Sequence, residues 1–509
     1  MAVAGSETPV ARRRRMPPRV AHGRPTSGEP FQRDIGQQDR AVNDLRRRAP
    51  DLSAATPLRR WQQLTLLAVP ALLTAGLIAL DGAGLYVWSL ILALPFFMIA
   101  LVRFTAVWHA LWRPLRRSKP LPADRRYDSR LPTFSVLLPL YREGRVVPAL
   151  IEGMARLDYP FDRLEILFIT EADDQMTRRA LLSAGLPPNM RIVTVPNGQP
   201  RTKPRALNYA LQDARGTLVA VFDAEDIPDA SQLRRAASAF IEGGPRLACV
   251  QARLSIYNAD ESFLSRQFAL EYSALFNGLL PALGFLRLPL TLGGTSNHFR
   301  RDLLLKIGGW DPFNVTEDAD LGIRLARFGY EVSVIDSETM EEAPASWRGW
   351  RGQRTRWIKG WIQTYLVHMR RPMRLWRDLG PWKFAGFQLT IGATILSLLV
   401  HPWFYALAAL HGSFGGRVVP EGDLLLWVSG SNLVAGYGAA MLLTMATAIA
   451  SGSARRLLSV IWLPLYWLAM SYAAYRAVLD LIVRPFYWEK TTHGTSKQKP
   501  PRRVRVRKT

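Results

Sequence analysis

Long apolar runs flank a polar middle section in this chain. Two runs, residues 64–80 and 85–104, come before the middle section, and three runs, residues 387–410, 424–450 and 457–483, come after it. Each run is close to the ~20 residues with which a helix crosses the ~30 Å hydrocarbon layer of a bilayer. The pattern therefore predicts a protein that crosses a membrane several times and carries a polar domain between its membrane segments.

Basic residues on the flanks of these runs predict the orientation. They crowd both outer ends of the first pair, so we expect a transmembrane hairpin over residues 61–105 with both ends in the cytosol. The polar section, residues 130–377, is then cytosolic, and the remaining membrane or interfacial helices fill residues 385–483. The tail, residues 484–509, is again basic, which favours the cytosol.

Three crossings after the polar section would leave that tail on the outer side, so hydropathy and charge disagree. We expect one of the three runs to lie at the interface or to re-enter the membrane. Residues 387–410 are the candidate, because His401-Pro402-Trp403 interrupts the run and a proline frees a backbone carbonyl. Both termini then lie in the cytosol.

Three short apolar stretches in the polar section are typical of strands. They cover residues 133–138, 164–170 and 217–222, and a polar loop and a helix-like stretch follow each of them. Strands that alternate with helices indicate a parallel α/β sheet, and such sheets bind ligands beyond the carboxyl ends of their strands. The sequence therefore predicts a site among the loops that follow these stretches.

The charge balance indicates a class of partner. With 66 Lys and Arg against 41 Asp and Glu, the formal net charge is +25, which suits an anionic partner. The apolar runs favour an anionic lipid bilayer over nucleic acid. The basic leader, residues 1–60, has several prolines and no apolar periodicity, so we expect it to be largely disordered. The single cysteine, Cys249, excludes an internal disulfide and a Cys-based zinc site.

Acidic and aromatic residues follow the first two predicted strands. Tyr141 and Glu143 come after the first, where the ring suits stacking on a base and the carboxylate suits hydrogen bonds from a ribose or base. Glu171 and Asp173 come after the second, where a solvated acidic loop accounts for them unless they face cations or hydrogen-bond donors.

Lys203 lies where a helix begins, between Arg201 and Arg205. The free N–H groups and the dipole of a helix N-terminus attract phosphate, and three cations strengthen that attraction. The segment predicts a diphosphate site, and a solvated basic turn is the alternative.

Asp223 and Glu225 follow the third predicted strand and lie on one side of the chain, within reach of one divalent cation. Mg²⁺ or Mn²⁺ keeps most of its shell as water and phosphate oxygens, so one or two carboxylates suffice. Asp226 is adjacent, and the sequence leaves open which of Glu225 and Asp226 is the second ligand.

Two later segments complete the set of candidates. Thr316-Glu317-Asp318 opens a helix; a capped helix with acids in its first turn explains it, and so does a carboxylate that removes a proton. Gln353, Arg356 and Trp357 lie just before the membrane runs resume. They fit an interfacial basic and aromatic helix, or a site with a cation against phosphate and a ring against a sugar.

Taken in order, these segments resemble the motifs of family 2 processive glycosyltransferases, such as the bacterial cellulose, chitin and hyaluronan synthases. Asp223-Ala224-Glu225 is similar to their D-x-D motif, Thr316-Glu317-Asp318 to T-E-D, and Gln353-Arg354-Thr355-Arg356-Trp357 to Q-x-x-R-W. Lys203–Asn208 is similar to a lysine-containing segment of these enzymes, and Gly293-Gly294-Thr295-Ser296 to an acceptor-side element.

The resemblance implies a fold, a reaction and a role for each residue. The fold is an α/β GT-A-type domain inserted between α-helical transmembrane segments, in the bacterial inner membrane with the catalytic domain cytosolic. The reaction is inverting transfer of a sugar from a UDP-sugar to a growing glycan, with Mg²⁺ or Mn²⁺ as cofactor. The implied roles are catalysis for Asp318, Glu317 and Asp223; metal binding for Asp223 and Glu225; and substrate binding for Tyr141, Glu143, Glu171, Lys203, Thr295, Gln353, Arg356 and Trp357.

UDP-glucose is the first donor to expect, as in a β-glucan synthase, with UDP-N-acetylglucosamine next. A periplasmic or regulatory export partner would be a separate protein. Two other functions remain open: a non-processive transferase that acts once on a lipid acceptor, and a membrane-anchored binding protein without enzymatic activity.

Overall fold

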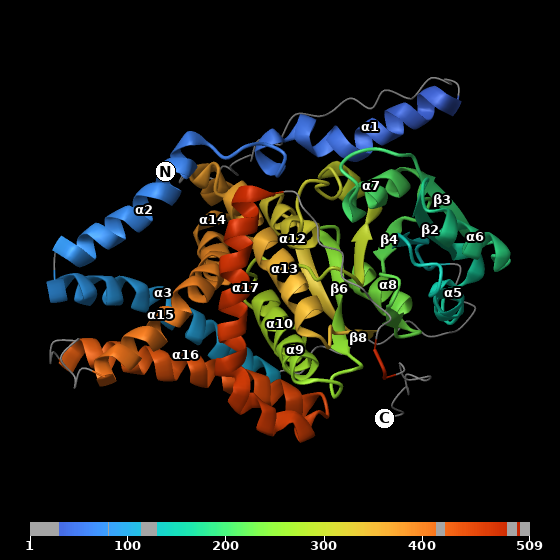
Figure 1. Cartoon of the computed structure of the whole chain (residues 1–509). Coiled ribbons are helices and arrows are strands. Elements are labelled where there is room, and N and C mark those ends of the chain that lie inside the picture. Colours follow the sequence, from blue (N-terminus) through green and yellow to red (C-terminus); the bar gives the residue numbers. More distant parts are fainter. Residues whose placement is uncertain (1–29, 80, 113–129, 414–422, 486–495, 499–509) are drawn as a thin grey trace, which may run out of the picture.

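The computed structural model describes residues 30–79, 81–112, 130–413, 423–485 and 496–498 (Figure 1). The polar section folds around an eight-stranded sheet in the order β3-β2-β1-β4-β7-β6-β8-β5. β1, β2, β3 and β4 pair in parallel, β7 is antiparallel to β4 and β6, and β8 is parallel to β6. The predicted α/β fold with a largely parallel sheet is confirmed. The strands are β1 Phe134–Leu140, β2 Leu164–Glu171, β3 Met190–Val195, β4 Leu218–Val221, β5 Ile227–Pro228, β6 Leu247–Ile256, β7 Asn297–Arg300 and β8 Glu331–Glu341.

Helices cover both faces of this sheet, so its strands are apolar on both faces, as parallel strands require. In β1, Val136 and Leu138 face the core under one layer of helices, and Leu137 faces the core under the other. The helices of this section are α5 Val147–Ala155, α6 Gln175–Ser183, α7 Lys203–Asp213, α8 Gln232–Glu242, α9 Phe263–Ala274, α10 Leu280–Phe285, α11 Arg301–Lys306, α12 Glu317–Arg327 and α13 Trp347–His368.

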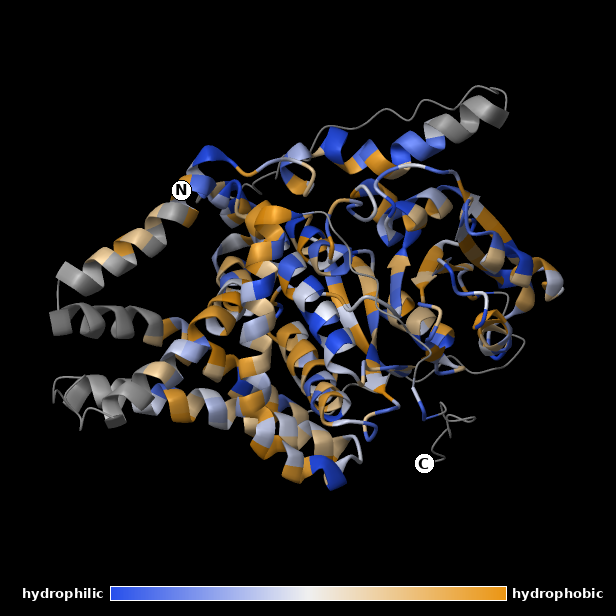
Figure 2. Cartoon of the chain, viewed as in Figure 1, coloured by the Kyte–Doolittle hydropathy of each residue, from blue (hydrophilic) through white to orange (hydrophobic). Residues whose placement is uncertain are grey.

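Long apolar helices extend from one side of the sheet domain (Figures 1 and 2). In the described residues, four helical stretches are long and apolar enough to cross a membrane: Ala93–Trp112, Pro372–Trp403, Gly430–Ala450 and Ala454–Val483. The first belongs to α3, which packs along α16. The helices outside the sheet domain are α2 Arg60–Ala79, α3 Asp81–Trp112, α14 Pro372–Phe387, α15 Ala393–Ser413, α16 Asp423–Ala450 and α17 Leu463–Val483.

The run over residues 387–410 is interrupted at a different place from the one expected. Pro402 lies inside α15, and the helix continues through it. The irregular points come earlier, at Gly380 with φ 73° and at the π-helical turn Gln388–Gly392. The number of membrane crossings stays a prediction.

The last helix and the tail lie against the sheet domain. α17 runs along α13, and a 3₁₀ segment, η5 Ala454–Trp462, connects it to α16 (Figure 1). In the tail, the backbone N–H of Ser496 donates to Glu342 (2.9 Å) and that of Lys497 donates to Glu261 (3.1 Å). The described part of the tail therefore lies on the same side of any membrane as the sheet domain.

The leader was expected to lack regular structure, and this is wrong for residues 30–52. They form α1 Pro30–Arg48 and a 3₁₀ turn, η1 Pro50–Leu52, laid across the sheet domain beside α7 (Figure 1). Gln37, Ala41 and Leu45 are spaced four residues apart and are buried on one helical face. This short buried face is hard to recognise in the sequence because Arg and Gln surround it, and the helix is stabilised by packing against α7. Residues 1–29 lie outside the described residues.

Candidate active site

Three of the predicted segments meet at one point beside the sheet. The Lys203 ammonium, at the start of α7, contacts the carboxylate of Asp223, which follows β4. The same ammonium donates to the carbonyl oxygen of Gly294 (2.8 Å). A side-chain oxygen of Asp318 also lies close to Gly294, so that an added Cβ would be 3.3 Å from it. The structure thus brings the diphosphate, metal and base candidates together.

The charges at this point are strongly coupled. Burial alone would lower the pKa of Lys203, but Asp223 and Glu317 outweigh it and raise that pKa. Burial, and then the neighbouring Asp318, raise the pKa of Glu317 to about 7. Burial also raises the pKa of Asp318, against the effect of the Ala319 N–H, which donates to it at 2.8 Å. Neighbouring carboxyl groups whose pKa values are raised by burial are suited to proton transfer.

Asp226 and Glu225 differ in their surroundings. Asp226 is buried and accepts the backbone N–H of Asp223 (2.6 Å) and the hydroxyl of Thr295. Its carboxylate therefore holds the loop after β4 against the loop of residues 293–296, and Thr295 takes part in that contact. Glu225 is partly exposed, which favours it over Asp226 as the second metal ligand.

The donor set fits a divalent cation. In the described residues, no group of three or more His, Cys, Asp or Glu side chains is arranged as a ready metal cage. Burial and the neighbouring carboxylates raise the pKa values of Asp226 and Glu341, and Asp223 and Glu225 are among those neighbours in both cases. Such an excess of negative charge is what a hard cation would relieve, and carboxylate oxygens are the ligands that Mg²⁺ and Mn²⁺ prefer.

The nucleoside candidates lie at the ends of β1 and β2. The guanidinium of Arg201 donates to the hydroxyl of Tyr141 (3.0 Å) and forms an ion pair with Asp173 (2.8 Å). Glu171 is buried and forms an ion pair with the fully buried Arg205 (2.6 Å). Of the two acids, Asp173 therefore lies beside Tyr141, and Glu171 ties β2 to α7. Glu143, two residues past Tyr141, is partly exposed on the same loop.

α13 presents the last three candidates. Gln353 is buried, and Arg356 is partly buried. Burial lowers the pKa of Arg356, and the carboxylates of Glu317 and Asp223 oppose that effect, so Arg356 lies within their field. The ring of Trp357 stacks on Tyr272 with centroids 6.3 Å apart.

Sequence reasoning missed the residues that hold Trp357. Arg354 forms an ion pair with Glu271 of α9 (2.8 Å), and its guanidinium lies 4.9 Å from the Trp357 ring centroid and 4.2 Å from that of Phe268. The hydroxyl of Tyr466 in α17 donates to the same Glu271 (2.8 Å). The signal was present as Arg354 inside the motif, but its partner Glu271 is 83 residues away in the sequence, and Tyr466, which also binds Glu271, lies 195 residues after Glu271.

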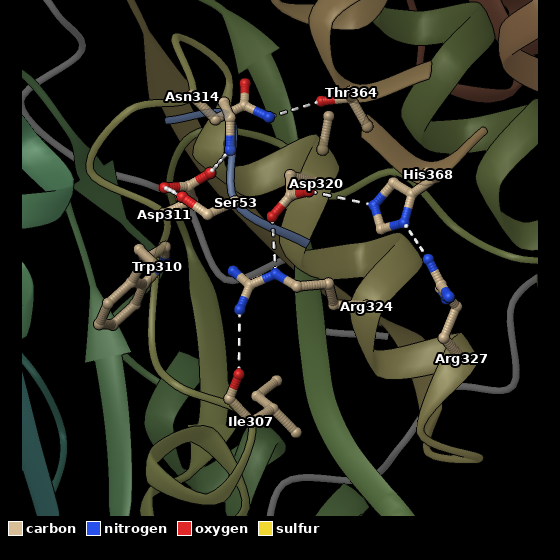
Figure 3. Close-up of polar contacts among 12 residues, drawn as sticks. Ser53, Ile307, Trp310, Asp311, Asn314, Asp320, Arg324, Arg327, Thr364 and His368 are labelled. Atoms are coloured by element: carbon tan, nitrogen blue, oxygen red, sulfur yellow. Dashed lines mark hydrogen bonds and ion pairs between the residues drawn. The ribbon is translucent and has the colours of Figure 1, made fainter. Parts of the chain in front are cut away.

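A second missed group centres on Asp320, two residues past the base candidate Asp318 (Figure 3). Asp320 is fully buried and accepts from Arg324 (2.6 Å) and from His368 of α13 (3.0 Å). Arg324 also donates to the carbonyl of Ile307 (3.1 Å). The i,i+4 spacing of Asp320 and Arg324 was visible, but an acid in a first helical turn is ordinary, so it did not stand out.

Comparisons with known proteins agree with this geometry. Residues 132–360 match the model of a family described as glycosyltransferase like family 2. The chain is 28% identical to a probable glycosyltransferase, YdaM, of Bacillus subtilis, over 47% of this chain and 58% of that protein. It is 29% identical to the beta-monoglucosyldiacylglycerol synthase of Synechocystis sp., over 53% of this chain and 58% of that protein. The chain thus spans less than two thirds of these relatives.

A solved structure with a similar fold is that of the mannosyltransferase PcManGT from Pyrobaculum calidifontis, in complex with GDP-Man and Mn²⁺. The two are 20% identical with a TM-score of 0.50, and the match covers 78% of this chain and 99% of that one. At this identity the likeness concerns the fold. Together with the family match, it shows that residues 132–360, which carry the converging Lys203, Asp223 and Asp318, are a glycosyltransferase family 2 domain with a GT-A-like fold.

Proposed function

We propose that this protein is an inverting, metal-dependent glycosyltransferase that takes a hexose from a UDP-sugar, UDP-glucose first, and adds it to a growing β-glycan at the cytosolic membrane face, coupled to export. The observation that carries the proposal is the meeting of Lys203, Asp223 and Asp318 around Gly294. The family 2 domain argues against a binding protein without enzymatic activity.

The donor end of the reaction uses the cations. As the bond from the sugar to the diphosphate breaks, negative charge grows on the leaving phosphate. Lys203 and Arg356 lie in the field of the same carboxylates, so both can move onto phosphate oxygens and stabilise that charge where it develops. A divalent cation on Asp223 and Glu225 would supply further positive charge at the diphosphate.

The acceptor end uses the carboxylates. Asp318 accepts the proton of the attacking hydroxyl, a contribution of typically ~10²–10⁴-fold. Its neighbour Glu317 is coupled to it, and burial raises the pKa of both carboxyl groups, which suits Asp318 to accept a proton. Trp357, held by Arg354 and stacked on Tyr272, offers an aromatic face against which the acceptor sugar can pack.

A single transfer to a lipid is the second candidate. It is favoured by the relatives named beta-monoglucosyldiacylglycerol synthase, from Synechocystis sp. and from Nostoc sp.. Other relatives are named as probable glucomannan 4-beta-mannosyltransferases of Arabidopsis thaliana, which fits the polymer proposal. The two candidates share the donor chemistry and differ in the acceptor.

The test is a donor panel with product analysis. Purified protein in lipid nanodiscs is incubated with UDP-glucose, UDP-N-acetylglucosamine or GDP-mannose, with Mg²⁺, Mn²⁺ or chelator. We expect UDP release from UDP-glucose only with a divalent cation, and a ladder of products that lengthens with time. A single product that extracts with lipid would support the second candidate, and no turnover with any donor would refute both.

A further inference from the structure

Residues 37–56, which we call the N-terminal strap, lie over α7, the helix that begins at Lys203. Gln37 donates to the carbonyl of Tyr209 (3.0 Å). The amide of Asn208 donates both to the carbonyl of Ala41 in the strap (3.0 Å) and to the carbonyl of Trp310 (2.8 Å). One buried side chain of α7 therefore joins the strap to the turn that precedes α12.

The strap is also fastened to the end of α13. Arg370 is buried and donates to three strap carbonyls: those of Asp51 (3.1 Å), Ser53 (2.7 Å) and Thr56. A buried guanidinium needs hydrogen-bond acceptors, and the backbone carbonyls of the strap are the acceptors of Arg370. α13 is the helix that carries Gln353, Arg356 and Trp357.

The central contact of the strap is with Asp311, which is completely buried. Its carboxylate accepts the hydroxyl of Ser53 (3.1 Å), the backbone N–H of Ala54 (2.6 Å) and the backbone N–H of Phe313 (3.2 Å) (Figure 3). Two of these three donors belong to the strap. Because an unsatisfied buried carboxylate is costly, Asp311 and the strap hold each other in place.

The turn that begins at Asp311 leads straight into α12 and Asp318. Its other side is fixed to α13, because Asn314 donates to the hydroxyl of Thr364 (2.9 Å) and Gln363 accepts the N–H of Val315 (3.1 Å). The turn thus lies between the strap and α13, and a shift on either side would move the start of α12.

We propose that the strap is a positioning element of the transfer site: Ser53 and Ala54 hold Asp311, and through it they set the place from which Asp318 reaches the acceptor hydroxyl. Asp311 and Ser53 are positioning residues and touch no substrate. The inference rests on the proposed function for its effect on turnover, but its effect on the turn can be measured without any substrate.

The test compares Ser53→Ala with Ser53→Thr, which keeps the hydroxyl, and with Ser183→Ala, the same change at an exposed site on α6. Turnover and donor KM are measured in nanodiscs, and amide hydrogen exchange of residues 312–319 is measured without donor. We expect Ser53→Ala to lower kcat about ten-fold, to leave the donor KM within about two-fold, and to speed exchange in that peptide. Ser53→Thr should keep most of the wild-type kcat and most of the wild-type protection from exchange, and Ser183→Ala should match wild type in both.

A cycle with Asp311→Asn separates positioning from general destabilisation. If Ser53 acts through Asp311, the double variant should lose little more turnover than Asp311→Asn alone, since residues that act through one contact are not additive. Unchanged kcat and unchanged exchange in a folded Ser53→Ala protein would overturn the inference, and so would additive losses in the double variant. If no donor is turned over at all, the proposed function fails, and the exchange result alone decides whether the strap holds the turn.

Discussion

Replacing Asp318 with Asn tests the assignment of the base with little change in shape. In the structure one carboxylate oxygen of Asp318 accepts the N–H of Ala319 (2.8 Å), and the amide oxygen of Asn can keep that bond. The other oxygen lies over Gly294, where the amide NH₂ of Asn would take its place. The helix start and donor binding should therefore survive, while the ability to accept a proton is lost.

The expected loss in kcat is at least ~10²-fold, which corresponds to about 2.7 kcal/mol of the activation barrier. The assay is release of UDP from UDP-glucose in nanodiscs, with UDP affinity measured separately by calorimetry. Asp302→Asn, an exposed acid in α11, is the matched control and should behave as wild type. If Asp318→Asn turns over within about three-fold of wild type, Asp318 only caps its helix, and the base must be sought elsewhere.

Three further outcomes are expected. Asp223→Ala should weaken the divalent-cation dependence of UDP binding, because one carboxylate of a sparse shell is lost; equal sensitivity to chelator in both proteins would contradict the metal assignment. Because the pKa of Glu317 is raised to about 7, we expect kcat/KM to rise with pH up to about 7, as the coupled pair of Glu317 and Asp318 loses a proton. Glu317→Gln should shift this rise in kcat/KM to lower pH, and no shift would show that the pair does not control the reaction. In a Cys249→Ala background, a cysteine at Ser496 should react only with cytosolic reagent; labelling of Ser496 from outside would mean an odd number of crossings after the sheet domain.

The sequence was most informative where strands end. A buried parallel strand must be followed by a turn at the same edge of the sheet, so polar residues after β1, β2 and β4 had to come close together in space. This is why the loops that carry Tyr141, Asp173 and Asp223 could be placed together from spacing alone. The helix starts at Lys203 and Glu317 were predicted for another reason, from local charge and from Thr316 at the N-cap position, although the Thr316 side chain makes no capping hydrogen bond.

Contacts between distant segments could not be predicted. The partner of Arg354 is Glu271, and nothing in either local sequence identifies the other. α1 has only a narrow apolar face, and its stability depends on α7, so its own composition suggested disorder. From the sequence, Asp320 is an ordinary acid in the first turn of a helix. Its hydrogen bond with His368 of α13 could not be predicted from either local sequence.

The apolar core around α9 has a consequence for how such proteins can be divided or recombined. Phe268 of α9, Ile358 of α13, Val460 of η5 and Met470 of α17 belong to one buried cluster. Hydropathy divides the chain into a polar enzyme section and apolar membrane helices, but in the structure the two share this buried cluster. A fragment that stops after α13 would expose this cluster, and a chimera that exchanges α17 between homologues would have to repack it. The sheet domain and α17 should therefore be kept together when the protein is truncated or recombined with a homologue.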